Sequence, residues 1–178
     1  MALESLLADA RADSALEEPA MPDDFRLVPI AHVRDARSEV EDDFWGGAVS
    51  RLVLTDVLEP SALEGVDTFS HVEVIFVFDR AEDSKLVRGA RHPRNNKSWP
   101  LTGILAQRAK NRVNRLGSTI CRVVRREGGT LWVRELDAVE GTPVVDIKPV
   151  LREFLPRDEV RQPAWASELM SDYWKTPN

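Results

Sequence analysis

The feature that most constrains the fold is a short stretch with apolar side chains at every second position. Ser70–Phe78 reads SHVEVIFVF, which places Val72, Val74, Phe76 and Phe78 on one face of an extended strand. A helix would spread these side chains around its axis. The period of two therefore predicts a β-strand with one buried face.

Five further segments have a strand-like composition and are separated by turn signals. They are Phe25–Arg34, Ala48–Leu58, Ser118–Arg126, Thr130–Leu136 and Val144–Ile147. Pro29 indicates that the first of them lies near an edge or a bulge. Several short strands with few convincing helices predict a mainly β protein, built as a single closed or nearly closed β-barrel with short helices and a C-terminal helix.

Side-chain directions follow from the same alternation. In Ser118–Arg126 we expect Thr119, Cys121 and Val123 to face inward, and Arg122 and Arg126 to face outward. The run Glu127-Gly128-Gly129 then indicates a hairpin into the next strand.

The 178 residues suffice for one domain with tails. We assign 1–22 as an acidic tail, 23–156 as the barrel and 157–178 as a C-terminal helical extension. The tail is either disordered or a helix that packs on a partner. A short helix is expected at Pro60–Glu64. The i,i+4 pairs Leu169/Tyr173 and Met170/Trp174 predict a helix that packs on the barrel or on a partner subunit.

Charge is distributed unevenly along the chain. The net charge is −6, yet Lys85–Arg126 holds twelve Lys and Arg and no acid, between acidic flanks. This asymmetry favours a site for a polyanion or an anionic ligand. The long segment 79–117 is expected to be a functional loop, unless it contains short strands.

The sequence also indicates where in the cell the protein is found and whether it binds a metal. The longest apolar run is Val74–Phe78, much shorter than a membrane span, and the N-terminus carries acids where a signal peptide is basic. The single cysteine, Cys121, excludes an internal disulfide and a cysteine-rich metal site. We expect a cytoplasmic protein with neither a metal nor membrane attachment.

Three segments carry residues suited to chemistry: Leu63–Phe78, Gly103–Gly117 and Leu136–Pro149. The third sets acids around a Gly-Thr-Pro turn, where carboxylates can bind hydroxyl or ammonium groups or serve as a base. Alternatively, Asp146 and Lys148 simply pair with each other. The second offers a positive, amide-lined loop for phosphates or base edges, or alternatively a solvated loop paired with surface acids.

Together these segments resemble the TsaA-like family, also called TrmO, of β-barrel S-adenosylmethionine-dependent methyltransferases. The resemblance covers about 70 % of the chain, from Phe25 to Pro149. It rests on the motifs Leu63-Glu64-Gly65, Phe69-Ser70-His71, Ala106-Gln107-Arg108, Arg112-Val113-Asn114-Arg115-Leu116-Gly117-Ser118 and Leu136–Pro149 (LDAVEGTPVVDIKP).

The resemblance implies a homodimer of barrel domains that binds S-adenosylmethionine without a Rossmann fold. It also implies methylation of N6 of threonylcarbamoyl-adenosine beside the anticodon of certain tRNAs. Carried over by position, the implied donor-binding residues are Asp43, Phe44, Trp45, Phe78, Asp79, Arg108, Ser118, Leu136 and Asp137.

Roles within this implied site follow from chemistry. Asp137 suits the ribose hydroxyls or the amino group of the donor. Phe44 or Trp45 is expected to stack on adenine or face the sulfonium, with a plain core role as the alternative for Trp45. Arg112, Asn114 and Arg115 are the expected acceptor-binding residues.

Methyl transfer from a sulfonium needs alignment first and a base second. Our candidate catalytic residues are Asp146 first and Glu140 second as the base, with Lys148 orienting the carboxylate or stabilising developing charge.

The chain also departs from the family pattern around the expected acceptor site. Val113 and Arg115 replace two prolines, Asp79 replaces a histidine, Glu140 an aspartate and Val150 a tyrosine. Three functions therefore stay open. The acceptor is tRNA, or it is a small metabolite, or the protein is a non-catalytic module that binds the donor or tRNA.

Overall fold

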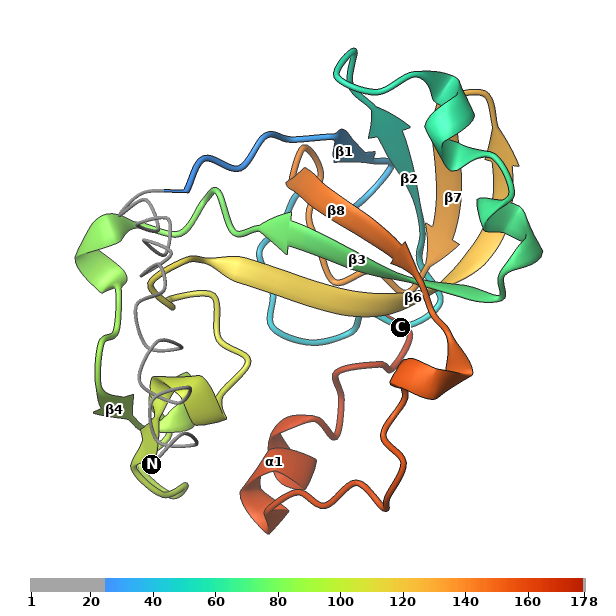
Figure 1. Cartoon of the computed structure of the whole chain (residues 1–178). Helices are drawn as coiled ribbons and strands as arrows, with labels where there is room; N and C mark the ends of the chain where they lie inside the picture. Colours follow the sequence, from blue (N-terminus) through green and yellow to red (C-terminus); the bar gives the residue numbers. More distant parts are fainter. Residues whose placement is uncertain (1–24, 178) are drawn as a thin grey trace, which may run out of the picture.

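The computed structural model describes residues 25–177 and has a six-stranded barrel at its centre (Figure 1). The acidic segment 1–22 lies outside the described residues. The elements are β1 (Ala31–Arg34), β2 (Val49–Leu54), β3 (His71–Val77), β4 (Ala90–Arg91), β5 (Thr102–Gly103), β6 (Leu116–Glu127), β7 (Thr130–Arg134), β8 (Pro143–Pro149) and α1 (Ala164–Leu169).

Neighbouring strands of the barrel are antiparallel and follow the order β1-β2-β7-β6-β3-β8, with β8 pairing back onto β1. The mainly β prediction is confirmed, and the barrel is the closed form. The core is the inward face of the alternating strands: Val72, Val74 and Phe76 of β3 are buried, as are Cys121 of β6 and Leu131 of β7.

Strand β6 is long enough to serve two neighbours. Its first half pairs with β3 and its second half with β7, and the register shifts between Val123 and Arg125. This bulge makes the expected outward direction of Arg126 wrong, because the extra residue reverses the alternation beyond it. Arg126 is opposite the buried Leu131 and only half-exposed, and it pairs with Asp67 at 3.8 Å.

The bounds of several expected elements differ from the prediction, and β2 ends at Leu54 rather than Leu58. The first strand begins at Ala31 rather than Phe25, and residues 25–28 are exposed. The long segment 79–117 does contain short strands, β4 and β5, which form a separate two-stranded sheet. The short helix expected at Pro60–Glu64 is present as a 3₁₀ helix, Pro60–Leu63.

The C-terminal helix is present but shorter than its pattern indicated. Helix α1 ends at Leu169, so Tyr173 and Trp174 lie beyond it, in a turn and not on a helical face. The two aromatic rings meet edge to face, with centroids 5.0 Å apart. No helix among residues 25–177 is long and apolar enough to cross a membrane.

Strand connections alternate between the two ends of the barrel. The β1–β2, β3–β6 and β7–β8 connections share one end, here named the loop end, and the β2–β3 and β6–β7 connections share the other. In Figure 1 the long β3–β6 connection leaves the barrel where β3 ends, whereas the C-terminal segment leaves β8 at the opposite end and passes below the barrel through α1. Residues 35–48, 78–115 and 135–142 form the three connections of the loop end, and residues 55–70 and 128–129 form the other two. The loop end therefore gathers most of the irregular chain.

Candidate functional site

Asp137 lies at the loop end, where β7 turns toward β8. Glu135 adopts a left-handed conformation (φ 66°), and Leu136 is 1 % exposed, so the chain turns and is anchored in the core just before the carboxylate. One carboxylate oxygen of Asp137 accepts a hydrogen bond from the Thr119 hydroxyl, and the other accepts one from the Tyr173 phenol. The carboxylate is therefore fixed from two sides.

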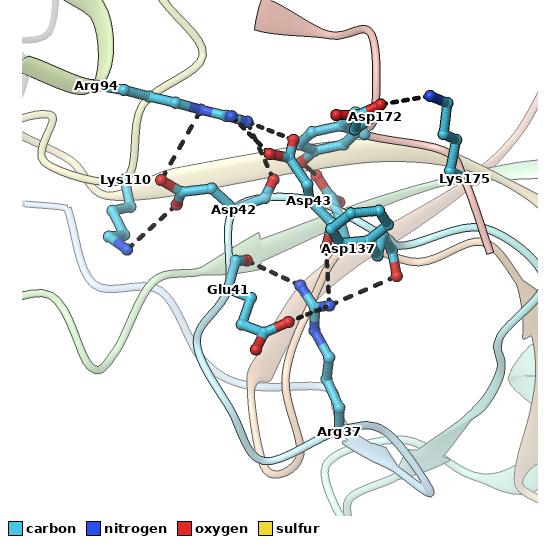
Figure 2. Close-up of polar contacts among 11 residues, drawn as sticks. Arg37, Glu41, Asp42, Asp43, Arg94, Lys110, Asp137, Asp172 and Lys175 are labelled. Carbon is cyan, nitrogen blue, oxygen red and sulfur yellow. Dashed lines mark hydrogen bonds and ion pairs between the residues drawn. The ribbon is translucent and has the colours of Figure 1, made fainter. Parts of the chain in front are cut away.

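The β1–β2 connection brings a second carboxylate, Asp43, to the same end. Both of its oxygens accept hydrogen bonds from the Arg94 guanidinium, each at 2.7 Å. Figure 2 shows Arg94 also reaching Asp42, which Lys110 approaches at 3.7 Å. The pairing raises the pKa of Arg94. Asp43 thus ties the β1–β2 connection to the long β3–β6 connection, in place of presenting a free carboxylate.

Phe44 and Trp45 follow directly and differ in their surroundings. Trp45 is 7 % exposed, and the Arg37 guanidinium lies 3.3 Å from its ring centroid. Arg37 also donates to the Asp43 carbonyl at 2.9 Å (Figure 2), and burial lowers its pKa. This placement favours the packing alternative for Trp45. Phe44 is 40 % exposed and has φ 62°, so its ring is available to a ligand.

The end of β3 supplies Phe78 and Asp79. Phe78 packs edge to face on the core residue Phe76, with ring centroids 5.3 Å apart. Asp79 is exposed. Arg80, which sequence reasoning missed, donates to the Ser38 carbonyl at 2.9 Å and the Glu140 carbonyl at 2.6 Å. A single arginine beside an acid gives no sequence signal for such a bridge.

Arg108 and Ser118 meet where the long connection joins β6. The Arg108 guanidinium donates to the Ser118 carbonyl, and the Ser118 hydroxyl donates to Glu73 of β3. Ser118 lies near the start of β6, opposite Ile75, and it faces outward because its neighbours Gly117 and Thr119 are buried. Arg108 is exposed.

The expected acceptor-binding loop is partly engaged within the chain. Arg115, with φ 51°, forms an ion pair with Asp83, and Arg112 donates to the Gln107 carbonyl at 3.5 Å. Asn114 is exposed.

The candidate catalytic residues are split between two places. Glu140 is in the β7–β8 connection, where it accepts hydrogen bonds from the Ala36 amide at 3.2 Å and from Arg34 at 3.3 Å. Asp146 and Lys148 pair with each other on β8 at 2.5 Å, and this pairing raises the pKa of Lys148.

Asp146 also lines a groove of about 440 Å³ formed with the β2–β3 connection and the apolar residues Leu54, Leu58, Phe69 and Ile147. That connection is at the end opposite the one that carries Asp137 and Glu140. Asp146 itself lies in the middle of β8, opposite Ile75 of β3, on the wall of the barrel. Of the two expected bases, only Glu140 lies in a loop-end connection with Asp137. No group of three His, Cys, Asp or Glu side chains among residues 25–177 is placed to hold a metal ion.

Tyr173 is the second residue that sequence reasoning missed. Its spacing from Leu169 indicated a helical face, whereas the structure puts its phenol on Asp137. Nothing in the i,i+4 pattern distinguishes these two outcomes.

Comparisons with known proteins agree on one family. The model of the tRNA-methyltransferase O N-terminal domain matches residues 43–154. RcsF from Pseudomonas aeruginosa, named as an S-adenosylmethionine-dependent methyltransferase, is 40 % identical over 129 residues, 69 % of this chain and 53 % of RcsF. The tRNA (adenine(37)-N6)-methyltransferase of Homo sapiens is 32 % identical over 117 residues, 66 % of this chain and 26 % of that protein.

Solved structures point the same way. A crystal structure of TrmO from Pseudomonas aeruginosa has a TM-score of 0.65 and 26 % identity, covering 83 % of this chain and 64 % of that one. The chain thus spans about half of RcsF and a quarter of the human relative. The matched residues include the barrel from β2 to β8 and most of the loop end. The chain belongs to the TrmO family, through that family's N-terminal barrel domain.

Proposed function

We propose that this protein is an S-adenosylmethionine-dependent methyltransferase that methylates N6 of a modified adenosine in tRNA, with N6-threonylcarbamoyladenosine as the acceptor. The observation that carries the proposal is the convergence of Phe44, Phe78, Asp79 and Asp137 at one end of a barrel that belongs to this family. The names of RcsF and of the human relative supply the donor and the tRNA adenine.

The donor is a nucleoside joined to a charged sulfonium and an amino acid, and the loop end offers matching chemistry. Asp137 binds the ribose hydroxyls or the amino group, because its carboxylate is an acceptor held in place. The exposed ring of Phe44 stacks on adenine or faces the sulfonium. Leu136 is buried in the core and Phe78 packs against that core, so both supply apolar surface at this end, and the exposed Asp79 follows Phe78.

The reaction is an in-line displacement at the sulfonium methyl carbon. The acceptor nitrogen attacks that carbon, the carbon–sulfur bond breaks with its electron pair leaving on sulfur, and the nitrogen gives up its proton. Alignment contributes about 7–11 kcal/mol in such reactions. Because the lone pair of the adenine N6 is delocalised into the ring, removing its proton with a carboxylate assists the attack.

The position of Glu140 favours it over Asp146 as that base, because Glu140 shares the loop end with Asp137. We expect Glu140→Gln to lower kcat by about 10²-fold or more and to leave the donor Kd nearly unchanged. The amide still accepts from the Ala36 backbone, so the connection keeps its shape. Turnover with tRNA and donor titration calorimetry measure the two effects.

Asp146→Asn is the matched control, and it should turn over at nearly the wild-type rate. The reverse result, in which only Asp146→Asn loses turnover, would assign the base to β8 and remove Glu140 from the mechanism.

A tRNA partner is supported by basic residues that form no ion pair with an acid among residues 25–177. Of the twelve in Lys85–Arg126, six form ion pairs with acids of the described chain: Lys85, Arg94, Lys110, Arg115, Arg125 and Arg126. The other six form no such ion pair within residues 25–177: Arg88, Arg91, Lys97, Arg108, Arg112 and Arg122. Phosphate contacts dominate nucleic-acid affinity, so the second group is the proposed interface.

The deciding experiment uses donor with a labelled methyl group, offered with bulk tRNA and with a metabolite extract. Label on a tRNA adenosine supports the proposal. Label on a small molecule would replace tRNA by a metabolite acceptor, and donor binding without transfer to either would make the protein a sensor.

We further propose a homodimer located in the cytoplasm. The dimer rests on the family resemblance, and the location follows from a tRNA substrate. Light scattering on the purified chain tests the dimer, and a single-chain mass would contradict it.

A further inference from the structure

The last described residues run beside the β1–β2 connection at the loop end. We name residues 172–175 the C-terminal strap. Three backbone hydrogen bonds join it to that connection: Phe44 N to Asp172 O at 3.2 Å, Trp45 N to Tyr173 O at 2.8 Å, and Gly46 N to Lys175 O at 3.2 Å. The strap lies outside residues 43–154, which match the family model.

Close approach of the two segments depends on a glycine. A Cβ added to Gly46 would lie 2.0 Å from the backbone oxygen of Trp174, closer than any side chain tolerates. Trp99 of the long connection adds a second attachment, since its indole donates to Glu168 of α1 at 2.8 Å. The β1–β2 connection thus holds the strap itself, and the β3–β6 connection holds helix α1 just before it.

The strap places one side chain on the proposed donor site. The Tyr173 phenol donates to one oxygen of Asp137, and the Thr119 hydroxyl of β6 donates to the other. A carboxylate offers about four acceptor positions, so two hydroxyl donors leave positions for a ligand. Burial, with the adjacent Asp137 charge and hydrogen bond, raises the pKa of Tyr173.

We infer that the C-terminal strap completes the donor site, with Tyr173 as a positioning residue that holds the Asp137 carboxylate in the orientation that binds the donor. The inference rests on the proposed function, because it deepens the role given there to Asp137. It assigns a part in donor binding to a segment that the family model does not reach. The substrate class is the sulfonium nucleoside itself, S-adenosylmethionine.

The first test is donor affinity by calorimetry on the full chain. Tyr173→Phe removes only the hydroxyl and should weaken S-adenosylmethionine binding by about tenfold, the size expected when a hydrogen bond to a charged group is removed. Gly46→Ala should weaken it in the same direction, since the added methyl displaces the strap. Lys85→Gln is the control, because it removes only the exposed ion pair of Lys85 with Glu82, which contains no strap residue.

Turnover separates positioning from general damage. In Tyr173→Phe the donor KM should rise while kcat at saturating donor stays near the wild-type value. A loss of kcat with unchanged KM would contradict the inference, and so would unchanged or tighter donor binding, because tighter binding means that the strap obstructs the site.

A spectroscopic readout does not depend on catalysis. Tyr173 is the single tyrosine of the chain, so the alkaline rise of tyrosinate absorbance reports on it alone. Its pKa is raised above the ordinary value of 10.0, first by burial and then by the charge and hydrogen bond of Asp137. Folding stability is therefore fully present below about pH 10 and falls as pH rises from there through the raised pKa, because the unfolded chain loses the phenol proton first. Asp137→Asn removes the adjacent charge and should move the titration back toward its ordinary value.

These outcomes separate the two proposals. If wild-type protein binds no donor, the proposed function fails and the strap's role fails with it. If wild-type protein binds donor and Tyr173→Phe binds it equally well, the strap inference alone is overturned. A tyrosinate titration at the ordinary pH, unmoved by Asp137→Asn, would also overturn it.

Discussion

At the scale of single residues, the loop end is organised by carboxylates with fixed partners. Both carboxylate oxygens of Asp43 accept hydrogen bonds from Arg94, and those of Asp137 accept hydrogen bonds from two hydroxyl groups. Their roles therefore differ. The Asp43–Arg94 pair links two connections, whereas Asp137 keeps acceptor capacity for a ligand, because hydroxyl donors leave its charge uncompensated.

The Asp43–Arg94 pair should be structural and measurable. Both side chains are about a quarter exposed and the contact is bidentate, so it exceeds the median surface pair. Arg94→Gln should lower the free energy of unfolding by about 1–2 kcal/mol, since Asp43 is left half-buried and unpaired. Denaturant melts of Arg94→Gln, Asp43→Asn and the double variant give the coupling. A coupling near zero would make the pair incidental.

At the scale of elements, strand positions were predictable and their ends were not. The alternation in Ser70–Phe78 corresponds to β3 almost residue for residue, because its inner face is entirely apolar. The direction of Arg126 was missed because a bulge leaves no mark in a pattern of apolar residues. The C-terminal helix was overextended for a different reason: Tyr173 serves a tertiary contact that i,i+4 spacing also permits.

Some site residues could be located from the sequence and others could not. Phe78 and Asp137 could be located from motifs, because Phe78 directly follows β3 and Asp137 belongs to the motif that joins β7 to β8. Phe44 could be located only loosely, because it lies inside the β1–β2 connection, five residues before β2. The separation of Asp146 from Glu140 could not, since it depends on where β8 begins: Asp146 lies on the barrel wall and Glu140 in the connection before that strand. Register and topology decide that, and one sequence does not state them.

The pairing of β6 with β3 leads to a prediction at this scale. A Cβ on Gly117 would lie 2.4 Å from the ring of Phe76, the opposite residue on β3. Gly117→Ala should therefore cost about 1–3 kcal/mol of unfolding free energy through overpacking. Gly129→Ala is the control, because its nearest neighbour would be at an ordinary 3.7 Å.

Denaturant melts of both variants measure the difference. Adding Phe76→Leu to Gly117→Ala should recover part of the loss by making room for the methyl group. Equal stability of the Gly117 and Gly129 variants would mean that the ring moves aside freely.

At the scale of the whole molecule, charge is arranged so that a net acidic protein still presents basic groups. The net charge is −6, and six of the twelve basic residues in Lys85–Arg126 pair with acids of the part of the chain that the structure describes. The interface with tRNA should thus be smaller than the sequence count suggests. This limits how strongly salt can weaken the complex.

That limit can be measured as the slope of log affinity against log salt. Six phosphate contacts correspond to a slope of about −4 to −5, and twelve would give about twice that. Arg88→Gln with Lys97→Gln should reduce the slope by about one for each phosphate left without its cation. Lys85→Gln is the control, because Lys85 is already paired with Glu82 at 2.6 Å. If the double variant has the same salt slope as the wild-type protein, the RNA does not bind at Arg88 and Lys97.

Closure of the barrel has a consequence for recognition. Each of its six strands has a strand neighbour on both sides, so the ring offers no whole strand whose main chain is free to be extended by a visiting peptide or by a sister copy. A visiting strand would find only partial edges, such as the half of β6 that each neighbour leaves unpaired. A partner of the barrel must therefore be recognised mainly by the side chains of the connections. Binding specificity can change through substitutions in these connections while the barrel strands stay the same.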